Sequence, residues 1–185
     1  IVGNNVSFTM PAEPVAVTIN FVFDDVHNMI ATGTSTNVGT EQGSGESGSI
    51  TVSSITDPTG HFTHNVLDYS YNMPNSGSYC GYSLPTDAGY KPNSKATGFA
   101  FWFMTNDKVY MEIKANGNSK VFNLPNTNGE WHYIYLADEA AKTATSFEVW
   151  MNYEKGGWSM SNPQGTMYIT EIQATNVTSQ DPIVP

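Results

Sequence analysis

Short runs of alternating apolar and polar residues recur along this chain, and each run is closed by Gly, Pro, Asn or Asp. A period of two in β-branched and aromatic residues is typical of half-buried β-strands, and the closing residues are typical of turns. Only residues 137–142 favour a helix, of about one or two turns. The pattern predicts an all-β fold, a β-sandwich jelly roll rather than a parallel α/β sheet. About ten strands are expected, at residues 15–23, 48–55, 65–72, 79–84, 97–104, 108–114, 119–123, 131–136, 146–153 and 166–174.

The charge of the chain limits which partners it can bind. The chain has 185 residues, which is enough for one domain with a buried core. It contains 17 Asp and Glu residues and 7 Lys and Arg residues, so its formal net charge is −10. All of the basic residues are Lys. Nucleic-acid binding needs a basic surface that neutralises phosphates, and an anionic membrane repels an acidic protein, so both partner classes are excluded. No apolar run is long enough to span a membrane, and we expect no membrane insertion.

Composition divides the chain into a main module and two flanking segments. Residues 23–178 hold nearly all of the predicted strands and form the predicted sandwich. Within them, residues 33–49 are rich in Gly, Ser, Thr, Asn and Glu, which predicts a long exposed loop. Residues 179–185 predict the start of a linker. Cys80 is the single cysteine, so we expect no disulfide framework and a small, semi-buried side chain at this position.

Residues 1–22 carry a motif of their own. The stretch from Val6 to Ala12 reads VSFTMPA, and the residues from Val15 to Ile19 then alternate. This segment resembles the closing strands of the small β-repeats of Gram-positive surface proteins. The resemblance implies the tail end of a preceding β-repeat, or a first strand, and with it a secreted or cell-surface parent protein built from several modules.

The sequence lacks the common arrangements of catalytic residues. β-Sandwich glycoside hydrolases commonly carry their carboxylates as ExDxxE on one strand, and this pattern is absent. Glu148 and Glu154 flank a turn-prone run, which is more typical of solvated carboxylates than of a shared site. His61 and His64 form an HxxH spacing with no third metal ligand beside it, which favours loop or strand-edge residues. GxSxG and HExxH are absent too, and we predict that the protein is not an enzyme.

Aromatic residues are the distinctive feature of the predicted strands. In 146–153, Trp150 and Asn152 share the face opposite to the apolar one, and in 108–114 Tyr110 and Glu112 do the same. A ring beside a polar side chain suits a sugar, which offers a C–H face for stacking and hydroxyls for hydrogen bonds. Trp158 follows two glycines in a predicted turn, where an exposed ring indicates function.

The same rings have a structural alternative. Trp and Tyr are good strand formers that pack across strands, so any one of them can belong to the core. Trp102 follows inward-facing Phe residues and is open to both interpretations, a binding face or a second buried layer. Trp131, at a strand start, favours a cap on the core. The better candidates for the ligand site are Tyr110, Trp150 and Trp158, because the sequence gives the least reason to place these rings in the core.

The order of the segments carries a second resemblance. The segments are FDDV at 23–26, VLDYSY at 66–71, YCGYSLP at 79–85, TGFAFW at 97–102, EWHYI at 130–134 and GTMYITEI at 165–172. Together they resemble the galactose-binding-like jelly-roll carbohydrate-binding modules, especially the family-eleven type of cellulosomal glucanases. The resemblance implies a non-catalytic module that holds a polysaccharide chain in the concave face of one sheet.

The resemblance also implies residues for the site. Tyr side chains stack on the sugar in such modules, which adds Tyr79 and Tyr82 of the YSLP segment to the candidates. The penultimate strand lines the cleft with an aromatic residue, and that strand singles out Trp150, Met151 or Tyr153 here, according to its register.

Two departures from the family pattern concern polar groups. These clefts often use an Arg on sugar hydroxyls, and the chain has none, so the substitute would be Lys114, Asn152 or Gln164. Such modules often hold a structural calcium ion between the first and last strands, and the matching acidic positions are Asp24, Asp25 and Glu171. The closing motif usually carries Asp where this chain has Glu171.

Two functions from different classes are therefore expected. The first is a glycan-binding module that belongs to a secreted or cell-surface system for polysaccharide degradation. The module is expected to be a monomer and to bind a plant glucan. A β-1,4-type glucan or xyloglucan is favoured by the resemblance, and starch stays open because ring geometry decides between them. The alternative is a structural or adhesive bacterial surface module that binds a protein partner.

Overall fold

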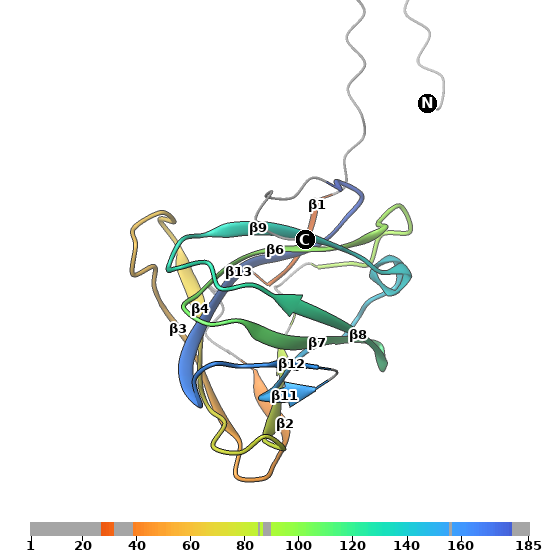
Figure 1. Ribbon diagram of the computed structural model, residues 1–185. Coiled ribbons are helices and arrows are strands. Elements are labelled where there is room, and N and C mark those ends of the chain that lie inside the picture. The colour runs from red at the N-terminus through yellow and green to blue at the C-terminus, as the bar shows by residue number, and fades with distance from the viewer. Residues whose placement is uncertain (1–26, 32–38, 85, 87–89, 156, 179–185) are drawn as a thin grey trace, which may run out of the picture.

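The computed structural model describes residues 27–31, 39–84, 86, 90–155 and 157–178. In these residues the chain forms two main antiparallel β-sheets and a small hairpin (Figure 1). The predicted all-β jelly-roll class is confirmed. The predicted strand at 15–23, residues 1–22 and the predicted linker at 179–185 lie outside the described residues.

The first sheet has six strands and is called the six-stranded sheet below. Its order is β3, β4, β13, β6 and β9, with β1 also paired to β13. The bounds are Ser49–Thr56 for β3, Asn65–Asn72 for β4, Gln164–Thr175 for β13, Gly98–Thr105 for β6, His132–Ala137 for β9 and His27–Ala31 for β1.

The second sheet is called the five-stranded sheet, and its order is β2, β5, β10, β7 and β8. The bounds are Thr40–Gly45 for β2, Tyr79–Leu84 for β5, Phe147–Asn152 for β10, Val109–Ala115 for β7 and Asn118–Leu124 for β8. A hairpin of β11 (Glu154–Lys155) and β12 (Trp158–Ser159) follows β10 and lies next to β7. The predicted short helix is a single 3-10 helix, Glu139–Lys142, which Asp138 caps.

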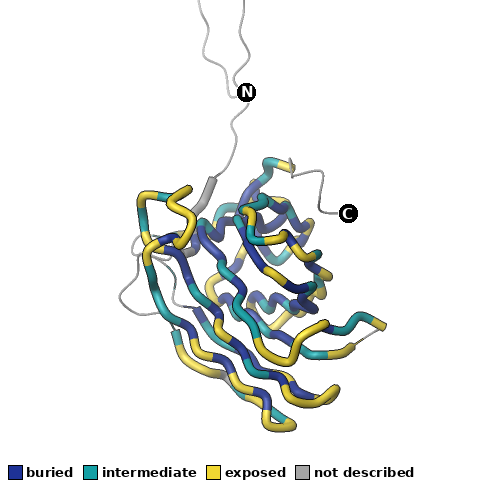
Figure 2. The backbone as a smooth tube through the Cα atoms, turned by 60° about the vertical axis from the view of Figure 1, so that its left-hand side comes forward, coloured by how far each residue is buried: buried dark blue, intermediate teal, exposed yellow. Residues whose placement is uncertain are grey.

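The core lies between the two sheets, and alternate residues of each strand supply it. On β10 the buried residues are Phe147, Val149 and Met151. Figure 2 shows the alternation of buried and exposed residues along the strands. β6 is buried along nearly its whole length, because a loop over residues 57–64 lays Phe62 against Trp102 on its outer side, with ring centroids 5.8 Å apart.

The structure corrects the expected exposed loop at 33–49. Thr40–Gly45 form the edge strand β2, and Ser49 begins β3. The prediction was wrong because β2 has few apolar residues: its place at the edge of the sheet needs backbone pairing with β5 and little side-chain burial. Cys80 is also more buried than expected, since its side chain is fully enclosed in the core. No helix among the described residues is long and apolar enough to cross a membrane.

Candidate functional site

The outward side of the five-stranded sheet gathers most of the rings and polar residues that the sequence singled out. The strand register puts Trp150 on β10 beside Gly81 on β5 and Glu112 on β7. One step along the same side, Asn152 lies beside Tyr79 on β5 and Tyr110 on β7, and one step the other way Glu148 lies beside Lys114. We call this outward side the ring face, and its members are Tyr79, Tyr110, Glu112, Lys114, Glu148, Trp150 and Asn152.

Two rings of the ring face lie flat on glycines of the neighbouring strand. A Cβ atom on Gly81 would lie 2.1 Å from Cδ2 of Trp150, so the indole occupies the space that any other side chain would need. In the same way, a Cβ atom on Gly45 would lie 2.3 Å from Cε1 of Tyr79. The two ring centroids are 6.5 Å apart and the ring planes differ by 32°. Together they form a low aromatic platform that extends from β10 across β5 to β2.

Charged and polar groups surround this platform. The indole N–H of Trp150 donates to Oε2 of Glu148 at 2.7 Å, which holds the ring in its orientation. The ammonium of Lys114 lies 3.9 Å from the centroid of the Trp150 ring, a cation–π contact. Oε1 of Glu112 accepts from the Ser119 hydroxyl at 2.5 Å. Glu112 is also 4.0 Å from the Lys114 ammonium and 3.8 Å from that of Lys155.

The hairpin closes one side of the ring face. Lys155 on β11 lies 5.9 Å from the centroid of the Tyr110 ring, and Tyr110 itself is only 5% exposed. Trp158 on β12 is half-buried, with its indole N–H enclosed and without a hydrogen-bond partner among the described residues. Tyr110 and Trp158 therefore lie at the border of the ring face, and neither exposes an open ring on which a sugar could stack.

Three of the predicted site residues lie away from the ring face. Tyr82 points inward and packs against the core, because it has the phase of Cys80 and Leu84 on β5. Tyr153 follows β10 and also packs against the core. Trp102 is on the other sheet, where it contacts Phe62 and Tyr133. The structure does not bring these three together with Trp150 and Tyr79.

Sequence reasoning missed some contributors to the ring face. Gly43, Gly45 and Gly81 form its floor, and Glu148 orients Trp150. Glu148 is two residues before Trp150 on the same strand, so the period of two predicts that both side chains lie on the same face. The glycines carried no such signal, because their role depends on rings from strands that are distant in sequence.

The described residues include only one member of the predicted calcium set, Glu171. Asp24 and Asp25 lie outside the described residues, and in the sequence they precede His27, which pairs with Thr175. Glu171 lies at the other end of β1, next to Ile172, the partner of Ala31, and its Oε1 is 3.8 Å from His64 Nε2. Within the described part of the chain no group of three or more His, Cys, Asp or Glu side chains could hold a metal ion.

The fold is that of several carbohydrate-binding modules. The structure is similar to the family 11 carbohydrate-binding module of the cellulosomal cellulase Lic26A-Cel5E of Clostridium thermocellum, with a TM-score of 0.54 and 15% identity over 83% of this chain and 96% of that one. A family 11 module from Clostridium thermocellum in complex with a β-1,3-1,4-mixed-linked tetrasaccharide matches with a TM-score of 0.53 and 16% identity, over 80% and 94%.

A third solved structure has the same fold. TmCBM27, a module described by its specific mannan recognition, matches with a TM-score of 0.50 and 9% identity over 84% of this chain and all of that one. No protein-family model and no curated protein matches the sequence. At these sequence identities the similarity to the three modules concerns the fold alone.

Proposed function

We propose that this chain is a non-catalytic module that binds a neutral plant polysaccharide on the ring face. One observation supports this most: two rings, Trp150 and Tyr79, lie on a floor of glycines with their planes 32° apart, and carboxylates, an ammonium and an amide surround them. A sugar ring presents a C–H face that packs on an aromatic ring, and its hydroxyls both donate and accept hydrogen bonds. Charged partners such as carboxylates make the stronger of these bonds.

The partners of the carboxylates favour binding over catalysis. Glu148 accepts the indole N–H of Trp150, and Glu112 accepts from Ser119 and lies near two ammonium groups. A glycoside hydrolase needs one carboxyl held as an acid and a second one free as nucleophile or base. Carboxylates that orient a ring or sit among ammonium groups suit a passive role.

For the ligand we infer a glucan, of the β-1,4 or mixed-linkage type or xyloglucan. The support is the resemblance in the sequence and one module with this fold, which was solved with a mixed-linked tetrasaccharide. Starch and mannan are the alternatives, the second because another module with this fold recognises mannan. We also propose a secreted or cell-surface parent protein, for which the motif in residues 1–22 is the support in the sequence.

Affinity gel electrophoresis tests the proposal and the ligand together. The full chain would be run in native gels that contain barley β-glucan, xyloglucan, glucomannan, galactan or amylopectin, with Trp150→Ala beside it. We expect barley β-glucan or xyloglucan to retard the wild type much more strongly than the variant. If no gel, and no insoluble cellulose, binds the wild type, the glycan-binding proposal is wrong and the protein-binding surface module becomes the better reading.

A structural calcium ion stays a prediction. If one is bound, the midpoint of thermal unfolding should fall when EDTA replaces calcium in the buffer, and Asp24→Asn with Asp25→Asn should remove that difference. Glu171→Gln tests the third member of the predicted set in the same way.

A further inference from the structure

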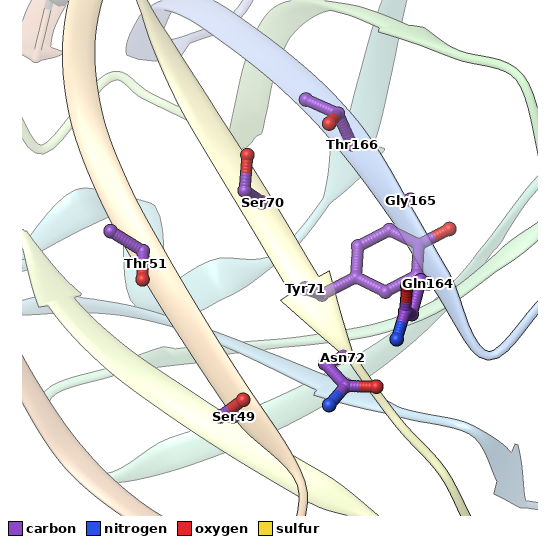
Figure 3. Close-up of a pocket in the computed structure, with 8 residues that line it drawn as sticks. All are labelled: Ser49, Thr51, Ser70, Tyr71, Asn72, Gln164, Gly165 and Thr166. Atoms are coloured by element: carbon purple, nitrogen blue, oxygen red, sulfur yellow. The ribbon is translucent and has the colours of Figure 1, made fainter.

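The outward side of the six-stranded sheet holds a polar trough that the ring face does not use. It has a volume of about 540 Å³ and is lined by residues of β3, β4 and β13, drawn in Figure 3. We call it the polar trough, and its lining residues are Ser49, Thr51, Ser70, Tyr71, Asn72, Gln164, Gly165 and Thr166. None of these lining residues carries a charge.

Strand register arranges the outward residues in two rows. Ser49, Asn72 and Gln164 form one row across the three strands, and Thr51, Ser70 and Thr166 form the next. The side chains of Asn72 and Gln164 make no hydrogen bond to another described residue, so their amide groups are open to a ligand. Hydroxyls and amides donate and accept equally, which matches sugar hydroxyls and gives no advantage to an ion.

A second hollow continues the polar trough on the far side of β13. It has a volume of about 210 Å³ and shares Tyr71, Gln164, Gly165 and Thr166 with the trough. It adds Asn106, Asp107, Asn162 and Tyr168, so this end of the groove carries one carboxylate. The ring centroid of Tyr168 is 6.5 Å from that of Trp131. The combined groove crosses β13, with neutral polar groups over β3 and β4 and an aromatic side chain at its other end.

Tyr71 has the inward phase of β4, and its buried hydroxyl lies beside Gly165 of β13 at the edge of the groove. Tyr71 is 4% exposed, lines both hollows, and its hydroxyl has no hydrogen-bond partner among the described residues. Burial and the nearby charge of Asp107 raise the pKa of Tyr71 to about 12, so the phenol stays protonated and can donate.

We propose that the groove across β13 is a second binding site for a neutral polysaccharide. This deepens the proposed function, since the ligand class is the same, but it rests on different residues in a different sheet. Two sites on opposite sides of one sandwich cannot bind the same short stretch of chain. The module therefore holds two polysaccharide chains, or two distant parts of one chain, and cross-links a soluble polymer.

The test removes the sites one at a time in the full chain. Trp150→Ala disables the ring face, Asn72→Ala with Gln164→Ala disables the trough, and Asn65→Ala is the matched control on β4. Asn65 is exposed and bonds only to Ser54 in the same sheet, away from the trough. Affinity gels and isothermal titration with barley β-glucan and glucomannan give the residual affinity, and turbidity of the mixture reports cross-linking. Unfolding midpoints confirm that each variant is folded.

We expect Trp150→Ala to keep weak binding to one of the two polymers and to lose turbidity. Adding the trough substitutions should lower the residual affinity by about fivefold or more, since each lost amide bond has an appreciable free energy, and Asn65→Ala should change nothing. If Trp150→Ala abolishes all binding, the ring face is supported and the second site is wrong. If the wild type binds neither these two polymers nor any of the other gels or cellulose, both proposals are wrong.

Discussion

Trp150 is the residue on which the proposed site depends most. Gly81 beneath it and Glu148 beside it leave the ring one orientation. We expect Trp150→Ala to weaken glucan binding by about 1–3 kcal/mol, the loss seen when a stacking ring is removed. Isothermal titration measures this loss of binding free energy. The comparison holds only if the unfolding midpoint of the variant equals that of the wild type. Compared with Trp150→Ala, Trp158→Ala should reduce the affinity less and the stability more, because Trp158 is half-buried. A larger loss of affinity from Trp158→Ala than from Trp150→Ala would place the binding site at the hairpin.

Lys114 competes for the ring that a sugar would use. With Gly81 on one side of the indole, the ammonium 3.9 Å from the ring centroid lies where a sugar would stack. Lys114→Met keeps the apolar stem and removes the charge, so we expect several-fold tighter binding of a neutral glucan. Lys155→Met is the matched control, because it removes one positive charge near Glu112 without touching Trp150. Weaker binding of Lys114→Met would instead assign Lys114 a direct hydrogen bond to the sugar.

At the scale of elements, β2 and β5 matter because they carry glycines. Gly81→Ala places a Cβ atom 2.1 Å from Trp150 Cδ2 and must displace the ring, whereas Gly43→Ala places it at 3.5 Å from Cη2, an ordinary contact. We therefore expect Gly81→Ala to weaken binding about as much as Trp150→Ala and to change the near-ultraviolet circular dichroism of tryptophan, and Gly43→Ala to change little. Equal effects of the two substitutions would contradict the platform.

The loop over residues 57–64 is held by one carboxylate. Burial alone would raise the pKa of Asp57, but hydrogen bonds from the backbone N–H groups of Phe62 and Thr59, the Thr59 hydroxyl and the Trp131 indole bring it below its ordinary value. A lowered pKa in the folded state stabilises the protein above the unfolded pKa of about 3.9, and this stability is lost as the pH falls through the folded pKa.

Asp57→Asn tests that role of the loop. We expect it to lower the free energy of unfolding by about 1–3 kcal/mol at pH 7, since an amide cannot accept all of these bonds. The difference from the wild type should shrink as the pH falls from about 3.9 through the lower pKa of the folded state, because the carboxyl then becomes protonated in the folded state too. Urea unfolding at pH 7 and pH 3 measures both values. A difference that does not vary with pH would assign the effect to packing.

At the scale of the whole molecule, the ring face is electrically balanced although the chain carries a net charge of −10. Glu112 and Glu148 are matched there by Lys114 and Lys155. We expect the affinity for a neutral glucan to change by less than about twofold between low and high salt, because screening acts on net charge and not on stacking. A steep salt dependence in the titration would point to an anionic glycan.

The period of two in the sequence determined most of the strands of the two sheets, though not the edge strand β2, and which residues share a face of each strand. Val109, Met111 and Ile113 are buried, and Glu112 and Lys114 face outward, as predicted. The same rule separates Tyr79 from Tyr82, since two residues three apart cannot face the same side of a strand. The resemblance named both, and the structure puts Tyr79 on the ring face and Tyr82 in the core.

Only the tertiary structure decided which faces meet. Trp102 and Trp150 have the same outward pattern in the sequence, yet one lies under Phe62 on the six-stranded sheet and the other on Gly81 of the five-stranded sheet. A local period has no information about strand order, because pairing joins segments far apart in the chain. The glycine floor, the cover of Lys114 on Trp150 and the polar trough all depend on that long-range register, so the sequence alone determines the class of fold and the structure determines the sites.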